Sequence, residues 1–151
     1  MPVSRTAVVA VEEIFALRWA VLRTGLPRET AVYPEDALPG TFHIAAYDET
    51  GAVGGCATFF PDAFPGEAAT AYRFRGMGSA PEVRGRGFGG AALTAGLREC
   101  AARGAALVWC HGRTSATDFY RHMGFERVGE EFLLEPSGLH YDFVTKDLLR
   151  G

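Results

Sequence analysis

The chain has 151 residues, of which 48% are hydrophobic and 22% are charged, so we expect one globular domain spanning residues 1–151. The net charge of −3 argues against a nucleic-acid-binding surface, which is normally basic. No run of about 20 apolar residues predicts a membrane span. The first ten residues also lack the apolar run of a secretory signal, and we therefore expect a cytoplasmic protein.

The three cysteines do not indicate a metal site or a disulfide framework. Cys56, Cys100 and Cys110 are scattered, odd in number and contain no CxxC pair. Such cysteines are most simply small apolar residues in a reducing compartment. We therefore expect no bound metal.

The N-terminal part of the chain predicts a strand, a helix and a loop. Thr6–Val11 is rich in β-branched and apolar residues, as in a short strand. Glu12 and Glu13 suit the start of a helix, and apolar residues then recur at helical spacing as far as Leu22. Thr24–Gly40 contains three prolines and two glycines, which predicts a loop with one helical turn.

The middle of the chain predicts three strands. Phe42–Tyr47 and Ala52–Phe60 flank a glycine-containing turn and predict a hairpin. Ala69–Ser79 predicts a longer strand, in which aromatic side chains alternate with arginines. Gly76 and Gly78 lie near its end and indicate a bulge or a close approach of the backbone to a ligand.

The C-terminal half predicts a long helix and four shorter elements. Phe88–Arg103 is rich in alanine and leucine and ends at Gly104, a suitable helix terminator. The order of helices and strands indicates an α/β fold with a mixed sheet. The remaining predicted elements are a strand, a helix and two strands, at Ala105–Cys110, Thr114–Met123, Phe125–Val128 and Leu139–Val144.

A glycine-rich turn precedes the long helix and is the strongest local signal. It reads Arg84-Gly85-Arg86-Gly87-Phe88-Gly89-Gly90. Glycines allow positive φ and close approach of the backbone, while a helix N-terminus offers unpaired N–H groups to an anion. Together with two arginines, these features predict a pyrophosphate site. The alternative from the motif alone is a tight structural connection with solvated arginines.

Two other phosphate-binding motifs fit the turn less well. A Walker A loop requires Lys before Ser or Thr, and no Lys is present here. Gly85, Gly87 and Gly90 match G-x-G-x-x-G, but a dinucleotide site expects an acidic residue about 20 positions later. Trp109, Cys110 and His111 occupy that place, so this interpretation is disfavoured.

Two blocks of the sequence resemble the GNAT superfamily of acyl-CoA-dependent N-acyltransferases. The family pattern Arg/Gln-x-x-Gly-x-Gly/Ala is met by Arg84, Gly87 and Gly89. A second family block, one helix and one strand later, reads Ala-x-x-Phe-Tyr-x-x-x-Gly-Phe. It is matched by Ala116, Phe119, Tyr120, Gly124 and Phe125.

The resemblance covers roughly Ala69–Val128 and has one departure. Many family members carry Asn where this chain has Arg113, so local contacts to the cofactor are expected to differ. The resemblance implies a mainly antiparallel central sheet flanked by helices. It also implies that this sheet is splayed between the strand before and the strand after the helix that follows the glycine-rich loop.

The resemblance also implies a mechanism, in which a neutral amine attacks the thioester of acetyl-CoA directly. Backbone groups of Met77, Gly78 and Ser79 are expected to bind the pantetheine arm, and Arg84–Gly90 the pyrophosphate. Tyr120 is expected to be the general acid, because a tyrosine is protonated at neutral pH. Without the glycine loop, the Phe119-Tyr120 pair indicates ordinary aromatic core.

The general base and the acceptor stay open at this point. Arg73 and Arg75 most simply lie on the solvent-exposed face of a half-buried strand. The alternative is that they contact an acidic acceptor. The segments Thr24–Gly40 and Gly129–His140 are expected to shape the acceptor pocket. Spacing does not rank the candidate bases, which are Glu82, Glu130, Glu131, His111 and His140.

The sequence thus favours an enzyme that acetylates a small-molecule or peptide amine, with no nucleic-acid or membrane partner. A homodimer is common in the family and stays open here. One alternative is a coenzyme A-binding sensor or interaction module without turnover, and another is a structural glycine turn in a domain that binds something else.

Overall fold

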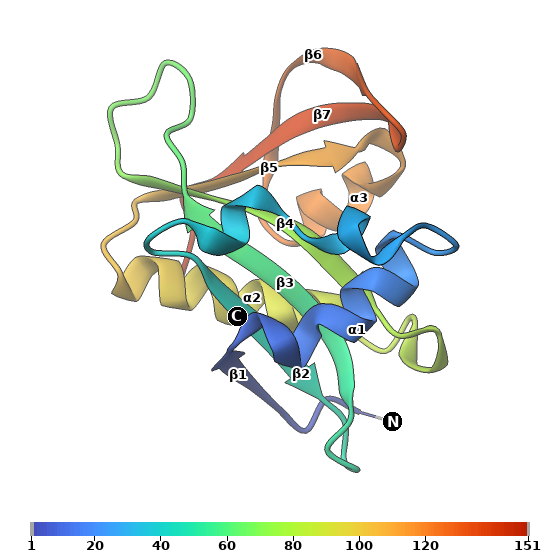
Figure 1. The fold of residues 1–151 in the computed structure, drawn as a ribbon. Coiled ribbons are helices and arrows are strands. Elements are labelled where there is room, and N and C mark those ends of the chain that lie inside the picture. Colours follow the sequence, from blue (N-terminus) through green and yellow to red (C-terminus); the bar gives the residue numbers. More distant parts are fainter. Residues whose placement is uncertain (1, 151) are drawn as a thin grey trace.

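The part of the chain that the computed structural model describes, residues 2–150, forms seven strands and three α-helices with short 3-10 turns (Figure 1). The strands are β1 (Arg5–Val9), β2 (Phe42–Tyr47), β3 (Val53–Pro61), β4 (Ala71–Ser79), β5 (Leu107–Arg113), β6 (Glu126–Leu134) and β7 (Gly138–Thr145). The helices are α1 (Val11–Leu22), α2 (Phe88–Ala102) and α3 (Thr117–His122). The 3-10 turns are η1 (Arg28–Ala31), η2 (Pro34–Ala37), η3 (Pro81–Val83) and η4 (Thr114–Ala116).

All seven strands belong to one sheet with the order β1-β2-β3-β4-β5-β7-β6. Every neighbouring pair is antiparallel except β4 and β5, which are parallel. The α/β class and the mainly antiparallel sheet predicted from the sequence are therefore confirmed. No helix within residues 2–150 is long and apolar enough to cross a membrane.

The helices α1 and α2 cover opposite faces of the sheet, in front and behind in Figure 1. Ile14 of α1 packs with Ala45 of β2, whereas Leu93 of α2 packs with Ile44 on the other face. Strand β2 is buried along its whole length because both of its faces are covered. Gly96 lets α2 approach the sheet closely, since a Cβ there would lie 1.9 Å from the Phe59 ring.

The sheet splays open between β4 and β5. Their ladder consists of three pairs, which begin at Ala71–Leu107 and end at Arg73–Trp109. Beyond this point β4 continues to Ser79 and β5 continues to Arg113 without pairing with each other. The backbone edges that face each other there are available to a ligand, and the predicted splay is confirmed.

A bulge in β4 lies at the predicted glycines. Thr58 of β3 pairs with Arg75, whereas Cys56 pairs with Gly78, so β4 holds one extra residue there. Gly76 occupies the bulge with φ +68°, and a Cβ there would lie 2.8 Å from the Tyr33 ring. Both the positive φ and the aromatic contact explain the need for glycine.

Three segments differ from the sequence-based expectation. The segment Thr24–Gly40 contains two 3-10 turns instead of one, because Arg18 of α1 is fully buried and bonds to both of them. Strand β5 continues past Cys110, since β7 pairs with it as far as Arg113. Strand β6 runs well beyond Val128, because it forms a hairpin with β7.

Candidate active site

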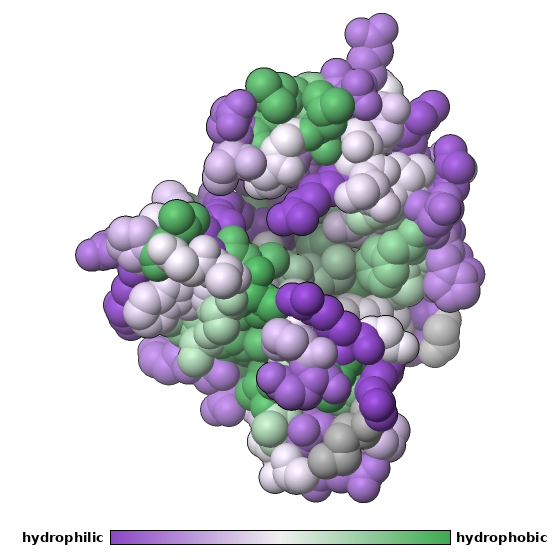
Figure 2. Space-filling model, turned by 90° about the vertical axis from the view of Figure 1, so that its right-hand side faces the viewer, coloured by the Kyte–Doolittle hydropathy of each residue, from purple (hydrophilic) through white to green (hydrophobic). Residues whose placement is uncertain are grey.

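A cavity of about 760 Å³ lies where β4 and β5 diverge. Its walls come from the end of α1, from β4 and β5, from Tyr120 of α3 and from the turn between β6 and β7. The face drawn in Figure 2 is hollowed in its middle, and hydrophilic side chains border the hollow. Of the tail Gly129–His140, the last residue of β6, three residues of the β6–β7 turn and His140 line this cavity.

The glycine-rich turn leads into α2 with the backbone geometry expected of an anion site. Gly85 and Gly87 have φ +76° and +84°, and within residues 2–150 no atom beyond the chain neighbours lies within 4 Å of a Cβ at either position. Backbone conformation, and not crowding, therefore requires glycine here. In the described part of the chain no side chain caps the N-terminus of α2, so its first N–H groups are available to a ligand.

The predicted cofactor residues are distributed over the cavity and its rim. Met77, Gly78, Ser79 and Arg84 line the cavity. The stretch 85–90 follows Arg84 directly and lies outside the cavity lining. Phe88 has a fully buried side chain that packs on Gly54 and Gly55 of β3, so only its backbone can serve a ligand.

Tyr120 lines the cavity from α3 and is held from several sides. It is 7% exposed and stacks on Phe143 with a centroid distance of 4.6 Å. Gly112 of β5 lies directly against the ring, where a Cβ would be 2.5 Å away. Burial raises the pKa of Tyr120 well above its ordinary value, and a hydrogen bond to Cys110 adds to this. Tyr120 therefore keeps its proton at neutral pH.

His111 of β5 forms an ion-pair geometry with Asp142 of β7. The two residues are opposite each other in the ladder, and Nδ1 lies 2.6 Å from the carboxylate Oδ1. Trp109 and Phe132 contact the imidazole edge-on at 5.2 and 5.3 Å between centroids. A carboxylate at Nδ1 favours the tautomer with the proton on that atom, which leaves Nε2 as an acceptor toward the cavity.

Of the other candidate bases, His140 lies in the cavity and the three glutamates do not. His140 lines the cavity, is 5% exposed and donates a hydrogen bond from Nδ1 to the Gly138 carbonyl at 2.7 Å. Glu82, Glu130 and Glu131 are exposed and do not belong to the cavity lining. Among the candidates from the sequence, only the two histidines are in the cavity.

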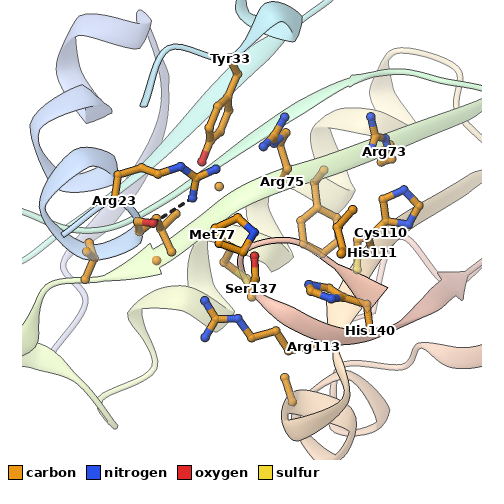
Figure 3. A pocket seen from close by; sticks show the side chains of 18 of the residues that line it. Arg23, Tyr33, Arg73, Arg75, Met77, Cys110, His111, Arg113, Ser137 and His140 are labelled. Carbon is orange, nitrogen blue, oxygen red and sulfur yellow. Dashed lines mark hydrogen bonds between the residues drawn. The ribbon is translucent and has the colours of Figure 1, made fainter. Parts of the chain in front are cut away.

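Arg73 and Arg75 line the cavity and are not simply a solvated strand face. Arg75 donates from Nη1 to Glu35 at 2.9 Å and lies over the Tyr33 ring at 3.8 Å. Arg73 donates from Nε to Asp62 at 3.0 Å, and its Nη2 lies 3.7 Å from Glu35. Figure 3 shows both guanidinium groups on the same side of the cavity as His111.

Arg113, the departure from the family pattern, lines the cavity on its other side (Figure 3). Its side chain makes no hydrogen bond or ion pair within residues 2–150, although its charge acts on Tyr120. Arg113 thus adds a positive charge near Tyr120, in a position where Asn would be neutral.

Sequence reasoning missed four residues of this site. Cys110 was interpreted as plain core, and its contact with Tyr120 depends on the packing of α3 against β5. Asp142 becomes visible only through the β5–β7 register. Tyr33 and Glu35 belong to the loop segment, in which no pattern of the sequence marks them.

Comparisons with known proteins agree with this geometry. The model of the acetyltransferase (GNAT) family matches residues 11–125. The chain belongs to the GNAT acetyltransferase family. It is therefore an acyl-CoA-dependent N-acetyltransferase, and acetyl-CoA is its cosubstrate.

Individual relatives are similar over almost the whole chain. The uncharacterized N-acetyltransferase YitI of Bacillus subtilis is 29% identical over 133 residues, which cover 87% of this chain and 89% of YitI. The structure of an acyl-CoA N-acyltransferase from Pseudomonas aeruginosa is 16% identical, with a TM-score of 0.73 and coverage of 93% and 98%. The NatC complex bound to Gag peptide and CoA contains a chain with 14% identity, a TM-score of 0.74 and coverage of 97% and 99%.

Proposed function

We propose that this GNAT protein transfers an acetyl or other short acyl group from acyl-CoA to a primary amine by direct attack. The observation that carries the proposal is the arrangement of three features in and beside one cavity. The edge of β4 that is not paired with β5, and the buried Tyr120, belong to the cavity lining, whereas the uncapped N-terminus of α2 lies beyond Arg84 at its rim.

The residues present fit coenzyme A. The unpaired edge of β4 from Met77 to Ser79 offers N–H and C=O groups to an extended pantetheine arm, as a neighbouring strand would. The first N–H groups of α2, with Arg84 and Arg86, suit a pyrophosphate. Acetyl-CoA would supply the activated thioester, and an N–H of the β4 edge would polarise its carbonyl oxygen.

Two side chains accept and donate protons in the proposed reaction. The amine nitrogen forms a bond to the acyl carbon as the carbon–sulfur bond breaks. Nε2 of His111 accepts the proton that the amine loses, because Asp142 holds the ring with that nitrogen as acceptor. Tyr120 donates its proton to the leaving thiolate, and its raised pKa ensures that the proton is present.

A binding experiment tests the first half of the proposal. At one hundred times its dissociation constant, a ligand adds about 2.7 kcal/mol of stability, which corresponds to a rise in Tm of roughly 5–10 °C for a domain of this size. We expect this rise with acetyl-CoA and coenzyme A but not with NAD. If Tm does not rise at millimolar acetyl-CoA, the proposed coenzyme A site is wrong.

A turnover experiment tests the second half. Release of free thiol from acetyl-CoA in the presence of a broad panel of primary amines is expected for an enzyme. Tight binding of acetyl-CoA without thiol release against any amine would instead support the alternative of a sensor or interaction module.

A further inference from the structure

We infer that the acceptor is a small amine that carries an oxyanion, either a carboxylate or a phosphate, and that Arg73 and Arg75 bind this group. The inference rests on the proposed function, because it names the acceptor class of the same cavity. It excludes polycationic acceptors such as polyamines and aminoglycosides.

The two arginines lie on the acceptor side of the cavity. Arg73 pairs with Trp109 at the last rung of the β4–β5 ladder, and Arg75 follows where the strands part. The glycine-rich loop follows the other end of β4, after Ser79. An acceptor that approaches the thioester from the side away from this loop therefore meets Arg73, Arg75 and His111 together (Figure 3).

Both guanidinium groups are fixed in place yet keep free donors. Arg75 lies over the Tyr33 ring at 3.8 Å, and Arg73 lies near the Phe60 and Trp109 rings at 4.8 and 5.3 Å. A guanidinium has five N–H donors, and each of these two arginines makes one hydrogen bond within residues 2–150. A rigid, incompletely bonded guanidinium fork is suited to bidentate binding of a carboxylate or phosphate.

The charges around the cavity favour an anion as well. Among the described residues, Glu135 is the single carboxylate in its lining, against five arginines. Glu35 and Asp62 form ion pairs with Arg73 and Arg75, and Asp142 lies against His111, so the excess positive charge comes from Arg23, Arg84 and Arg113. Arg23 bonds only to backbone carbonyls, and Arg113 has no carboxylate partner in the described chain. The lining arginines are Arg23, Arg73, Arg75, Arg84 and Arg113.

This excess of positive charge has two consequences for an amine. It repels a polycation, since like charges in a partly buried site raise the free energy of binding. It also favours the neutral form of the reacting amine over the ammonium form, and only the neutral form is nucleophilic. An amine that carries its own oxyanion is attracted by the arginines, and its reacting nitrogen is still favoured in the neutral form.

The experiment compares matched acceptors by thiol release. Each pair shares a carbon skeleton, with one member carrying a carboxylate and the other its primary amide. A second set pairs amino-alkyl phosphates with amino alcohols, so that the two kinds of oxyanion are distinguished. We expect kcat/KM to be at least tenfold higher for the anionic member of one set. A preference for the neutral members or for spermidine would overturn the inference while leaving the acetyltransferase function intact.

Variants show whether Arg73 and Arg75 carry the preference. Arg73→Gln and Arg75→Gln are expected to raise the KM of the anionic acceptor about tenfold or more and to leave the KM of acetyl-CoA unchanged. Arg121→Gln is the matched control, because Arg121 is exposed and lies outside the cavity lining. Unchanged acceptor KM values in both cavity variants would contradict the assigned contact.

A binding experiment tests this inference independently of the proposed function. The coenzyme A-loaded protein is titrated calorimetrically with an N-acetyl amino acid, an N-acetylaminoalkyl phosphate and their neutral analogues. Binding of an anionic probe that is lost in Arg73→Gln and Arg75→Gln supports the inference even if no amine is acetylated. Equal binding of anionic and neutral probes contradicts it even if acetylation is observed.

Discussion

The two ends of the cavity are built in different ways. At the end with the glycine-rich turn, the groups that we propose to bind the ligand are backbone N–H groups, and Gly85 and Gly87 have the positive φ of this turn. At the acceptor end, the groups are side chains from distant parts of the chain, and ion pairs hold them. A backbone site accepts a constant group, whereas a side-chain site can be changed residue by residue. We therefore expect acceptor specificity to depend on the side chains at the ion-paired end.

The ion-paired end depends on one buried residue. Arg18 is fully buried and donates two hydrogen bonds to Asp36, at 2.7 and 3.0 Å. It also bonds to the Ala31 carbonyl and to Thr58 of β3. Its guanidinium lies 4.0 Å from the centre of the Tyr33 ring, on which Arg75 also stacks. Arg18 thus fixes the segment that carries Tyr33 over the cavity.

The largest expected effect is on this anchor. Arg18→Met leaves the partly buried Asp36 without its cation, so the free energy of unfolding should fall by about 3–5 kcal/mol. Chemical denaturation measures the change, and Arg121→Met, at an exposed position, is the control. A loss below 1 kcal/mol would show that the segment over the cavity is held by other contacts.

Next in size is the effect of removing the Tyr120 hydroxyl. Tyr120→Phe should lower kcat by about 10²–10⁴-fold, as expected for loss of a general acid, with little change in acetyl-CoA affinity. Tyr141→Phe is the control, since Tyr141 lies outside the cavity lining. If the Tyr120→Phe protein folds, binds acetyl-CoA and keeps full turnover, Tyr120 is not the general acid.

A smaller loss of kcat is expected when His111, the proposed proton acceptor, is replaced. His111→Gln should reduce kcat by about 10²-fold and respond to added imidazole. His122→Gln, at an exposed position, should leave kcat unchanged. If His111→Gln keeps full kcat, His140 becomes the better candidate because it also lines the cavity.

A matched pair of glycine substitutions tests whether the glycine-rich turn binds coenzyme A. Gly87→Ala and Gly66→Ala both place a side chain at φ +84°, with no atom of the described residues within 4 Å apart from the chain neighbours, so each should cost about 1–2 kcal/mol in strain. Only Gly87→Ala should weaken coenzyme A binding, by roughly tenfold, as measured by calorimetry. Equal coenzyme A affinity in the two variants would place the pyrophosphate elsewhere.

The smallest effect is a pH dependence in the buried network behind the acceptor end. Burial lowers the pKa of His43, with Asp36 opposing the change and Arg18 adding to it. The unfolded chain therefore takes up a proton near pH 6.5 that the folded chain does not. Stability should fall as the pH drops below about 6.5, and the fall should be smaller in His43→Gln. An identical pH dependence in both proteins would exclude His43 as its source.

Much of the fold was predictable because its signals are local. The glycine-rich turn, the long helix after it and the weakened end of β4 each depend on the conformational preferences of a few neighbouring residues. The same is true of the second block, in which Phe119-Tyr120 precedes Gly124. These patterns also carried the resemblance to the GNAT family, which the comparisons confirm.

The sequence by itself thus determined the α/β class, the family and the position of the turn before α2. Only the tertiary structure decided that Arg73 and Arg75 share Glu35 and that His111 meets Asp142. The physical reason is that these contacts join residues about 30 to 40 positions apart, on strands and turns whose register is set by the packing of the whole sheet.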